Sequence, residues 1–222
     1  MAEPLTRVVG LRPTTRLHSR ALLLAAGAAA LAACGGGSRL APSPDAPPPP
    51  APDLTGAVVM LLPTQESVYT RGPADGGGSS GEMLDAELAF WLQEHSPHVR
   101  WVLPDRLREH LARSPGLGID IAHLDVSVFR HAQVKRIGDP LFGDLVRLGS
   151  LAGARFALIP AFAAYAPGAN GGPGRLEIAA TLIDCSDGRV YWFGVVAGEP
   201  GAPGERATAA SAAQALARAL FR

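Results

Sequence analysis

Two kinds of hydrophobic pattern after residue 54 indicate strands. Three segments are apolar almost throughout, which is typical of strands covered on both faces; they are residues 57–63, 99–103 and 155–162. Residues 176–184 instead alternate apolar and polar side chains, and residues 189–196 follow them after a Ser-Asp-Gly turn. The pattern therefore predicts about five strands, of which the last two form an antiparallel hairpin.

Apolar residues at helical spacing predict helices between these strands. Ser79 and Glu82 form a capping box before one helix, and Asp105 is expected to cap a second, shorter one. Asp139-Pro140 begins a third, with the proline at its first position, and residues 205–222 form an alanine-rich fourth. Residues 114–138 are ambiguous between loop and a short helix near 125–134. The order of elements predicts an α/β (α+β) fold, a mixed sheet with flanking helices.

A separate apolar run lies near the start of the chain. Residues 21–33 are uncharged, follow four arginines and end in small residues, as a secretory signal does. They number 13, whereas a membrane-spanning helix needs roughly 20. The sequence Leu-Ala-Ala-Cys that ends at Cys34 resembles the lipobox of bacterial lipoproteins, whose cysteine thiol receives diacylglycerol. We therefore expect a signal peptide at 1–33 and lipidation of Cys34; an ordinary signal with an incidental cysteine is the alternative.

The residues after Cys34 are rich in glycine and proline. Residues 34–53 cannot form a packed core, and their proline run favours an extended linker. We expect one periplasmic domain at 54–222. Position 35 is Gly; in the lipoproteins that the lipobox resembles, an Asp there favours retention in the inner membrane. The resemblance therefore implies a palmitate-type anchor in the outer membrane, facing the periplasm.

The composition indicates one folded domain and no binding of nucleic acid. The chain is 47% hydrophobic, which suffices for one buried core. Beyond the signal, 16 basic and 19 acidic side chains remain, so no basic surface for nucleic acid is indicated. With Cys34 lipidated, Cys185 has no intramolecular partner and the fold depends on its core.

Three segments resemble parts of a known group of envelope proteins. They are the early strand AVVMLLP, then LGSLAGARFALIPAF, and LIDCSDGRVYWFG, which carries Asp184, Gly188, Val190 and Trp192 at matching positions. The sequence resembles lipoprotein domains related to the TolB amino-terminal domain, the curli and Pel secretion lipoproteins and the penicillin-binding-protein activators. Its motifs are a helix–strand junction and a hairpin turn, and carry no catalytic residue. The resemblance implies a non-enzymatic accessory of an envelope assembly, secretion or cell-wall machine.

A glycine-rich segment offers the main alternative. Residues 76–81 fit the dinucleotide pattern G-x-G-x-x-G, and Asp105 follows the next strand. The fingerprint requires its first glycine directly at a strand end, however, and a long gap separates Pro63 from Gly76. We expect a glycine loop that binds no nucleotide; the alternative is a lipid-anchored hydrolase or nucleotide-binding enzyme.

Other residues whose side chains could take part in catalysis or metal binding are better explained by structural roles. His95, His98 and His110 lie near acidic residues, but Pro97 breaks the helix between the first two, so a solvated helix end is favoured over a zinc site. Asp184 and Asp187 are good turn residues, although a carboxylate pair is able to perform acid–base chemistry. Cys185 is expected to be inert. Ser127 and Ser150 lack the G-x-S-x-G elbow of a nucleophile. We expect no cofactor, metal or small-molecule substrate.

The hairpin at 176–196 is apolar on both faces. If one face is uncovered, Tyr191, Phe193 and Val195 form an interaction surface for self-association or for an envelope protein. The alternative is that helices cover both faces. A pore of the curli type needs two long membrane hairpins, and residues 176–196 supply one.

Overall fold

The computed structural model describes residues 51–68, 80–130, 134–168 and 172–221. The expected signal peptide, Cys34, the proline-rich linker as far as residue 50, Gly76 and the capping residue Ser79 lie outside them. Within the described residues, no helix has the length and apolar character needed to cross a membrane.

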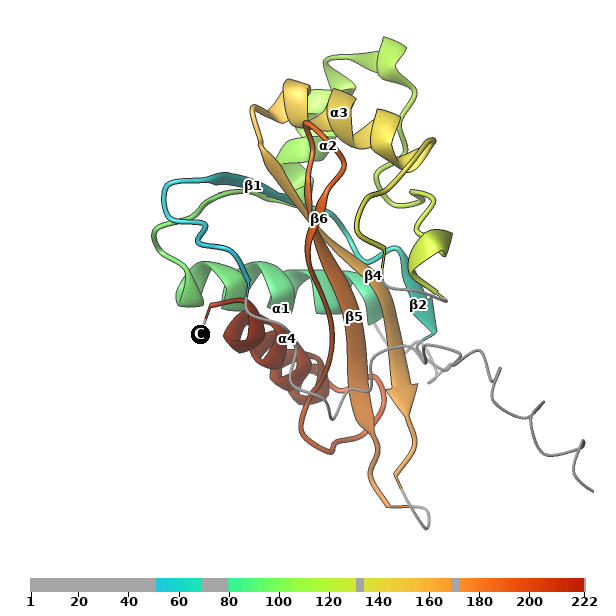
Figure 1. Ribbon diagram of the computed structural model, residues 1–222. Helices are drawn as coiled ribbons and strands as arrows, with labels where there is room; N and C mark the ends of the chain where they lie inside the picture. The colour runs from blue at the N-terminus through green and yellow to red at the C-terminus, as the bar shows by residue number, and fades with distance from the viewer. Residues whose placement is uncertain (1–50, 69–79, 131–133, 169–171, 222) are drawn as a thin grey trace, which may run out of the picture. The chain divides into compact units, whose positions relative to one another are not determined.

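The strands form one mixed sheet, as predicted (Figure 1). The strands lie in the order β3-β1-β4-β5-β6. Strand β1 pairs in parallel with β3 and β4. Strand β5 pairs antiparallel with both β4 and β6. Strand β2 pairs in parallel with the second half of β4 and was not predicted, because its three residues are too few to show a period. The bounds are β1 Val58–Leu61, β2 Glu66–Val68, β3 Arg100–Val102, β4 Phe156–Ala166, β5 Arg175–Asp184 and β6 Val190–Ala197.

Four α-helices accompany the sheet: α1 Ser80–His95, α2 Pro104–Ala112, α3 Leu141–Ala152 and α4 Arg206–Leu220. Two expected helix starts are wrong in detail. Leu103, not Asp105, is the cap of α2, because Pro104 already supplies the first helical residue. Pro140 is the cap of α3 and not its first residue, while the Asp139 carboxylate accepts a hydrogen bond from the Gly143 amide at 3.0 Å.

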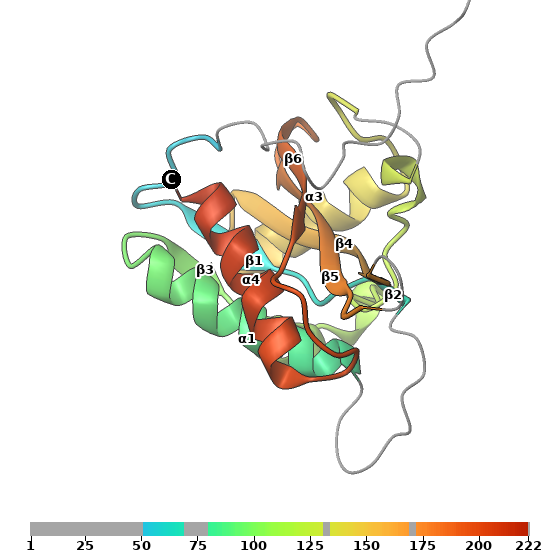
Figure 2. The same ribbon diagram turned by 90° about the horizontal axis from the view of Figure 1, so that it is seen from below.

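Helices α1 and α4 cover one face of the sheet (Figures 1 and 2). The small side chains of α4 let it lie close to the strands and to α1, and the leucines of α1 fill the space between them. Each completely buried leucine stabilises the fold by about 1.5–3 kcal/mol relative to an exposed one. The side chains at this contact include Leu84, Leu88, Leu92, Ala212, Ala213 and Leu216.

The opposite face is covered by α2, α3 and the described residues of the segment 117–137, which are 117–130 and 134–137. Where a short helix was considered near 125–134, the described residues up to 130 form a 3-10 turn at Ser127–Phe129, and residues 131–133 lie outside the described part of the chain. The Phe129 ring stacks on that of Phe193 with centroids 5.8 Å apart. Helices and this segment thus cover both faces, and Phe193 is 6% exposed. The condition set for an exposed aromatic face, an uncovered side of the hairpin, is therefore not met at Phe193, whereas Tyr191 and Val195 are half-buried.

Candidate functional site

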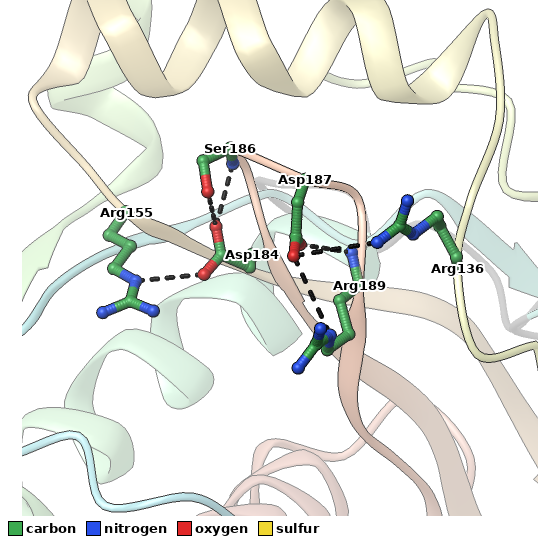
Figure 3. Close-up of polar contacts among 6 residues, drawn as sticks. All are labelled: Arg136, Arg155, Asp184, Ser186, Asp187 and Arg189. Carbon is green, nitrogen blue, oxygen red and sulfur yellow. Dashed lines mark hydrogen bonds and ion pairs between the residues drawn. The ribbon is translucent and has the colours of Figure 1, made fainter.

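Five charged side chains lie around the β5–β6 turn, namely Arg136, Arg155, Asp184, Asp187 and Arg189 (Figure 3). Gly188 closes the turn at φ 71°, a conformation that a glycine adopts without strain. Its amide donates to the Asp184 carbonyl and its carbonyl accepts from the Ile137 amide, both at 2.9 Å. The turn is thus fixed both to its own strand and to the 117–137 segment.

Asp184 holds the turn from within. The residue is 2% exposed. Its carboxylate accepts hydrogen bonds from the Ser186 amide at 2.9 Å, the Ser186 hydroxyl at 2.6 Å and Arg155 Nε at 3.0 Å. Burial by itself raises the pKa of Asp184, but the Ser186 hydrogen bonds and the Arg155 charge outweigh it and lower the pKa below its usual value. Asp184 is therefore an ionised structural anchor, and its lowered pKa does not suit a proton-transfer role near neutrality.

Three arginines surround the turn and remain open to solvent. The side chains of Arg136 and Arg155 are 63% exposed and that of Arg189 is 56% exposed. Arg136 and Arg189 approach the Asp187 carboxylate at 3.9 and 3.8 Å. Figure 3 shows the terminal nitrogens of Arg155 and Arg189 directed away from the turn, where an external group is able to reach them.

Aromatic rings support two of these guanidinium groups. Arg155 lies over the Phe156 ring at 4.8 Å from its centroid, and Arg189 lies 5.8 Å from that of Tyr191. The two rings meet edge to face at 5.5 Å. A register shift between Leu182 and Ile183 leaves Tyr191 as the extra residue of a bulge, a device that redirects a side chain. We name Arg155, Phe156, Arg189 and Tyr191 the arginine–aromatic surface.

The residues behind the turn are tightly packed. A Cβ atom on Gly149 of α3 would lie 2.9 Å from both the Ala154 carbonyl oxygen and Cys185 Cβ, so only glycine lets α3 approach so closely. Gly153 ends α3 at φ 62°. Burial, and after it the charge of Asp184, raises the pKa of the Cys185 thiol to about 12. The motif LGSLAGA therefore has a packing role, and Cys185 is an unreactive protonated thiol.

The other candidate residues are not brought to this site. His95 Nδ1 lies 3.0 Å from the Trp91 carbonyl oxygen at the end of α1, and His110 Nδ1 lies 3.3 Å from Arg113; His98 is exposed. In the described ranges, no three His, Cys, Asp or Glu side chains cluster as metal ligands do. The Ser127 hydroxyl donates to Asp125 at 2.6 Å and the Ser150 hydroxyl to the Val146 carbonyl at 2.8 Å, so each makes a local bond.

Two surface hollows also lie elsewhere. One, of about 290 Å³, is formed around Leu111, Pro115 and Asp120, and the other, of about 270 Å³, around Pro167, Arg175 and Pro200. Neither includes a residue of the arginine–aromatic surface. Of the glycine-rich segment, Ser80 and Gly81 begin α1, and residues 76–79 lie outside the described residues.

Sequence reasoning singled out Asp184, Asp187 and Tyr191 but missed Arg136, Arg155 and Phe156. Arg155 begins an apolar strand and is 29 residues from Asp184, so no local pattern pairs them. The signal that pairs these residues is the register of β4 with β5, which sets Phe156, the residue after Arg155, opposite Asp184.

No protein-family model matches the sequence, and the search of curated proteins returns no match. Solved structures do match. A PelC dodecamer from Paraburkholderia phytofirmans is 18% identical, covering 79% of this chain and 96% of that chain with a TM-score of 0.38. The LpoB C-terminal domain from Escherichia coli is 14% identical, covering 66% and 85% with a TM-score of 0.36. Lipoprotein GNA1162 from Neisseria meningitidis is 14% identical, covering 67% and 84% with a TM-score of 0.39.

Proposed function

We propose that this chain is a non-enzymatic lipoprotein of the bacterial envelope, anchored through Cys34 in the outer membrane. Its periplasmic domain binds another envelope protein as an accessory of an assembly, secretion or cell-wall machine. The anchor rests on the sequence: an apolar core, small residues and the lipobox cysteine stand in the order that export and lipidation require. Two or more acyl chains give stable membrane attachment, since each buried methylene contributes about 0.8 kcal/mol.

The arginine–aromatic surface is the observation that carries the protein-binding role. Arginine and aromatic side chains are enriched at protein contacts, where a guanidinium binds carboxylates and a ring supplies apolar area. Here the Arg155 side chain is held by Asp184 on one side and by the Phe156 ring on another. Such preorganisation lowers the conformational entropy lost on binding. The surface therefore suits a partner that presents a carboxylate beside an apolar side chain.

Lipid attachment is tested by metabolic labelling with an alkyne-bearing fatty acid. The wild-type chain should incorporate the label and sediment with membranes, and Cys34→Ala should do neither. Cys185→Ala is the matched control, because it removes the other cysteine and should label as the wild type does. Equal labelling of Cys34→Ala would refute the anchor.

The partner contact is tested by site-specific cross-linking in living cells. A photoreactive amino acid at Arg136, an exposed residue beside the turn that is not part of the arginine–aromatic surface, should yield a discrete cross-linked product in the otherwise wild-type chain. Adding Arg155→Ala should reduce that product strongly, whereas Arg113→Ala, an exposed arginine beyond the end of α2, should not. A yield unchanged by Arg155→Ala would show that partner binding does not use this surface.

A further inference from the structure

The described part of the domain begins on the same face of the sheet as the arginine–aromatic surface. Leu54 is buried in the hydrophobic cluster between the sheet and helices α1 and α4, and both Ala51 and Tyr191 pack against this cluster. The chain reaches it by a turn, in which the Ala57 amide donates to the Leu54 carbonyl at 2.9 Å. Figures 1 and 2 both show the blue segment before β1 next to the end of α4 marked C. The residues that precede Ala51 in sequence therefore start from this face.

The distance from this start to the arginine–aromatic surface is short. Arg155 lies next to the first residue of β1, because its amide donates to the Val58 carbonyl at 3.1 Å. Tyr191 in β6 is three strand spacings from β1, which is roughly 14 Å at about 4.8 Å per spacing. A polyproline helix rises about 3.1 Å per residue, so ten residues span about 31 Å. Residues 41–50, which directly precede Ala51, are therefore long enough to cross the surface.

The composition of residues 41–50, APSPDAPPPP, complements that of the surface. The segment holds six prolines and a single charged residue, Asp45. A polyproline helix has three residues per turn, so Pro42, Asp45 and Pro48 would share one edge of it. This edge presents a carboxylate between two apolar rings, which is the kind of group that the exposed arginines and the Tyr191 ring suit. Proline-rich segments bind aromatic surfaces with little loss of entropy, because their backbone is already extended.

We propose that residues 41–50 bind the arginine–aromatic surface of their own chain. Asp45 pairs with the guanidinium groups of Arg155 and Arg189, and the prolines on either side of it contact Tyr191. The tether favours this occupant over a separate acidic peptide, since a short linker gives an effective concentration in the millimolar range and a weak contact then suffices. The consequence rests on the proposed function: the linker and the partner protein compete for one surface, so the partner must displace the linker.

Intrachain cross-linking in the full-length protein tests the contact. A photoreactive amino acid at Ala46, next to Asp45, should give a product that migrates as a single chain. Mass spectrometry should locate the cross-link within residues 155–156 or 189–191. A product that joins two copies, or one that maps elsewhere on the domain, would show that the linker does not bind its own surface.

A charge exchange tests the pairing of Asp45 with the surface. Asp45→Arg or Arg189→Glu alone should lower the intrachain yield about two- to fivefold, as expected for an exposed ion pair. The double variant Asp45→Arg/Arg189→Glu restores opposite charges and should restore the yield. Asp53→Asn is the matched control, because the Asp53 carboxylate accepts a local hydrogen bond from the Thr55 amide at 2.9 Å. A double variant as weak as the single ones would contradict the pairing.

Competition is tested with the partner cross-link from position 136. Asp45→Asn should raise that yield about twofold or more, because a surface that is occupied part of the time has a lower apparent affinity for a partner. A partner product that Asp45→Asn leaves unchanged would show that the linker does not regulate the surface. An intrachain product from position 46 without any partner product from position 136 would instead refute the proposed function and leave the linker contact standing.

Discussion

Asp184 shows how one buried carboxylate organises the surface around it. Because its pKa is lowered in the folded protein, its stabilising contribution is present above the ordinary value of about 3.9 and is lost as the pH falls through the folded-state pKa. The same interactions orient Arg155, whose own pKa is raised by Asp184. Stability and the geometry of the arginine–aromatic surface therefore depend on one residue.

Asp184→Asn should lower the free energy of unfolding by about 1–3 kcal/mol at pH 7, since it removes a buried charge that accepts three hydrogen bonds. Urea unfolding between pH 3 and 7 measures this, and the difference from wild type should shrink toward the acid end. Asp187→Asn is the control, because Asp187 is more exposed and its amide replacement still accepts the Arg189 N–H. A pH-independent loss in Asp184→Asn would contradict the assignment.

The sequence identified Asp184 as a turn residue because Asp, Ser and Gly in succession favour a tight turn. It did not reveal that this carboxylate is buried, since that depends on Arg155 and on the packing of α3. The lipidation of Cys34, in contrast, is a prediction that rests on four adjacent residues, because an export signal is read locally along the chain.

At the scale of elements, the strands were predictable because both faces of the sheet are covered and the strands are accordingly apolar. The 117–137 segment was not predictable, because its 3-10 turns lack a hydrophobic period and are held by distant contacts. The Gln65 side chain supplies two of them, donating to the Ile121 carbonyl at 2.9 Å and accepting from the Leu124 amide at 2.7 Å. Phe129 of this segment covers Phe193, so this side of the hairpin is buried.

The junction of α3 with the end of β5 gives a sharp test of helix docking. Gly149→Ala should destabilise the fold by about 1–3 kcal/mol, because its Cβ would meet the Ala154 carbonyl and Cys185 Cβ at 2.9 Å. Gly143→Ala, in the same helix, meets only the Asp139 carboxylate at 3.1 Å and should be neutral or stabilising by up to about 1 kcal/mol. Thermal unfolding distinguishes them, and similar melting temperatures would contradict close packing at Gly149.

At the scale of the whole molecule, the expected organisation separates attachment from recognition. In the proposed organisation, lipid on Cys34 serves attachment and the arginine–aromatic surface serves recognition. The sheet and its helices followed from hydrophobic patterning, whereas the arginine–aromatic surface depends on residues distant in sequence, such as Arg155 and Asp184. This surface could therefore be identified only from the fold.

The alternative of a nucleotide-binding enzyme makes a different prediction for the intact chain. We expect no heat when NAD or ATP is titrated into the purified full-length protein, because the glycine-rich segment lacks the strand-end position of a phosphate-binding loop. Calorimetry at protein concentrations near 50 μM, on the order of the value needed to detect micromolar binding, checks this. Saturable binding that is lost on replacing Gly76 and Gly78 by Ala would revive the enzyme hypothesis.

The burial of Cys185 has a practical consequence for following this protein in its own membrane. Once Cys34 carries lipid, Cys185 is the remaining thiol of the chain, and it is 4% exposed beneath Gly149. Maleimide added to intact membranes should therefore react only during transient separation of α3 from β5, so the labelling rate reports an opening equilibrium in place. Labelling should be faster in Gly149→Ala than in wild type, and occupation of the β5–β6 turn by a partner should slow it. One native sulfur atom thus allows local unfolding and partner binding to be timed without an added probe site.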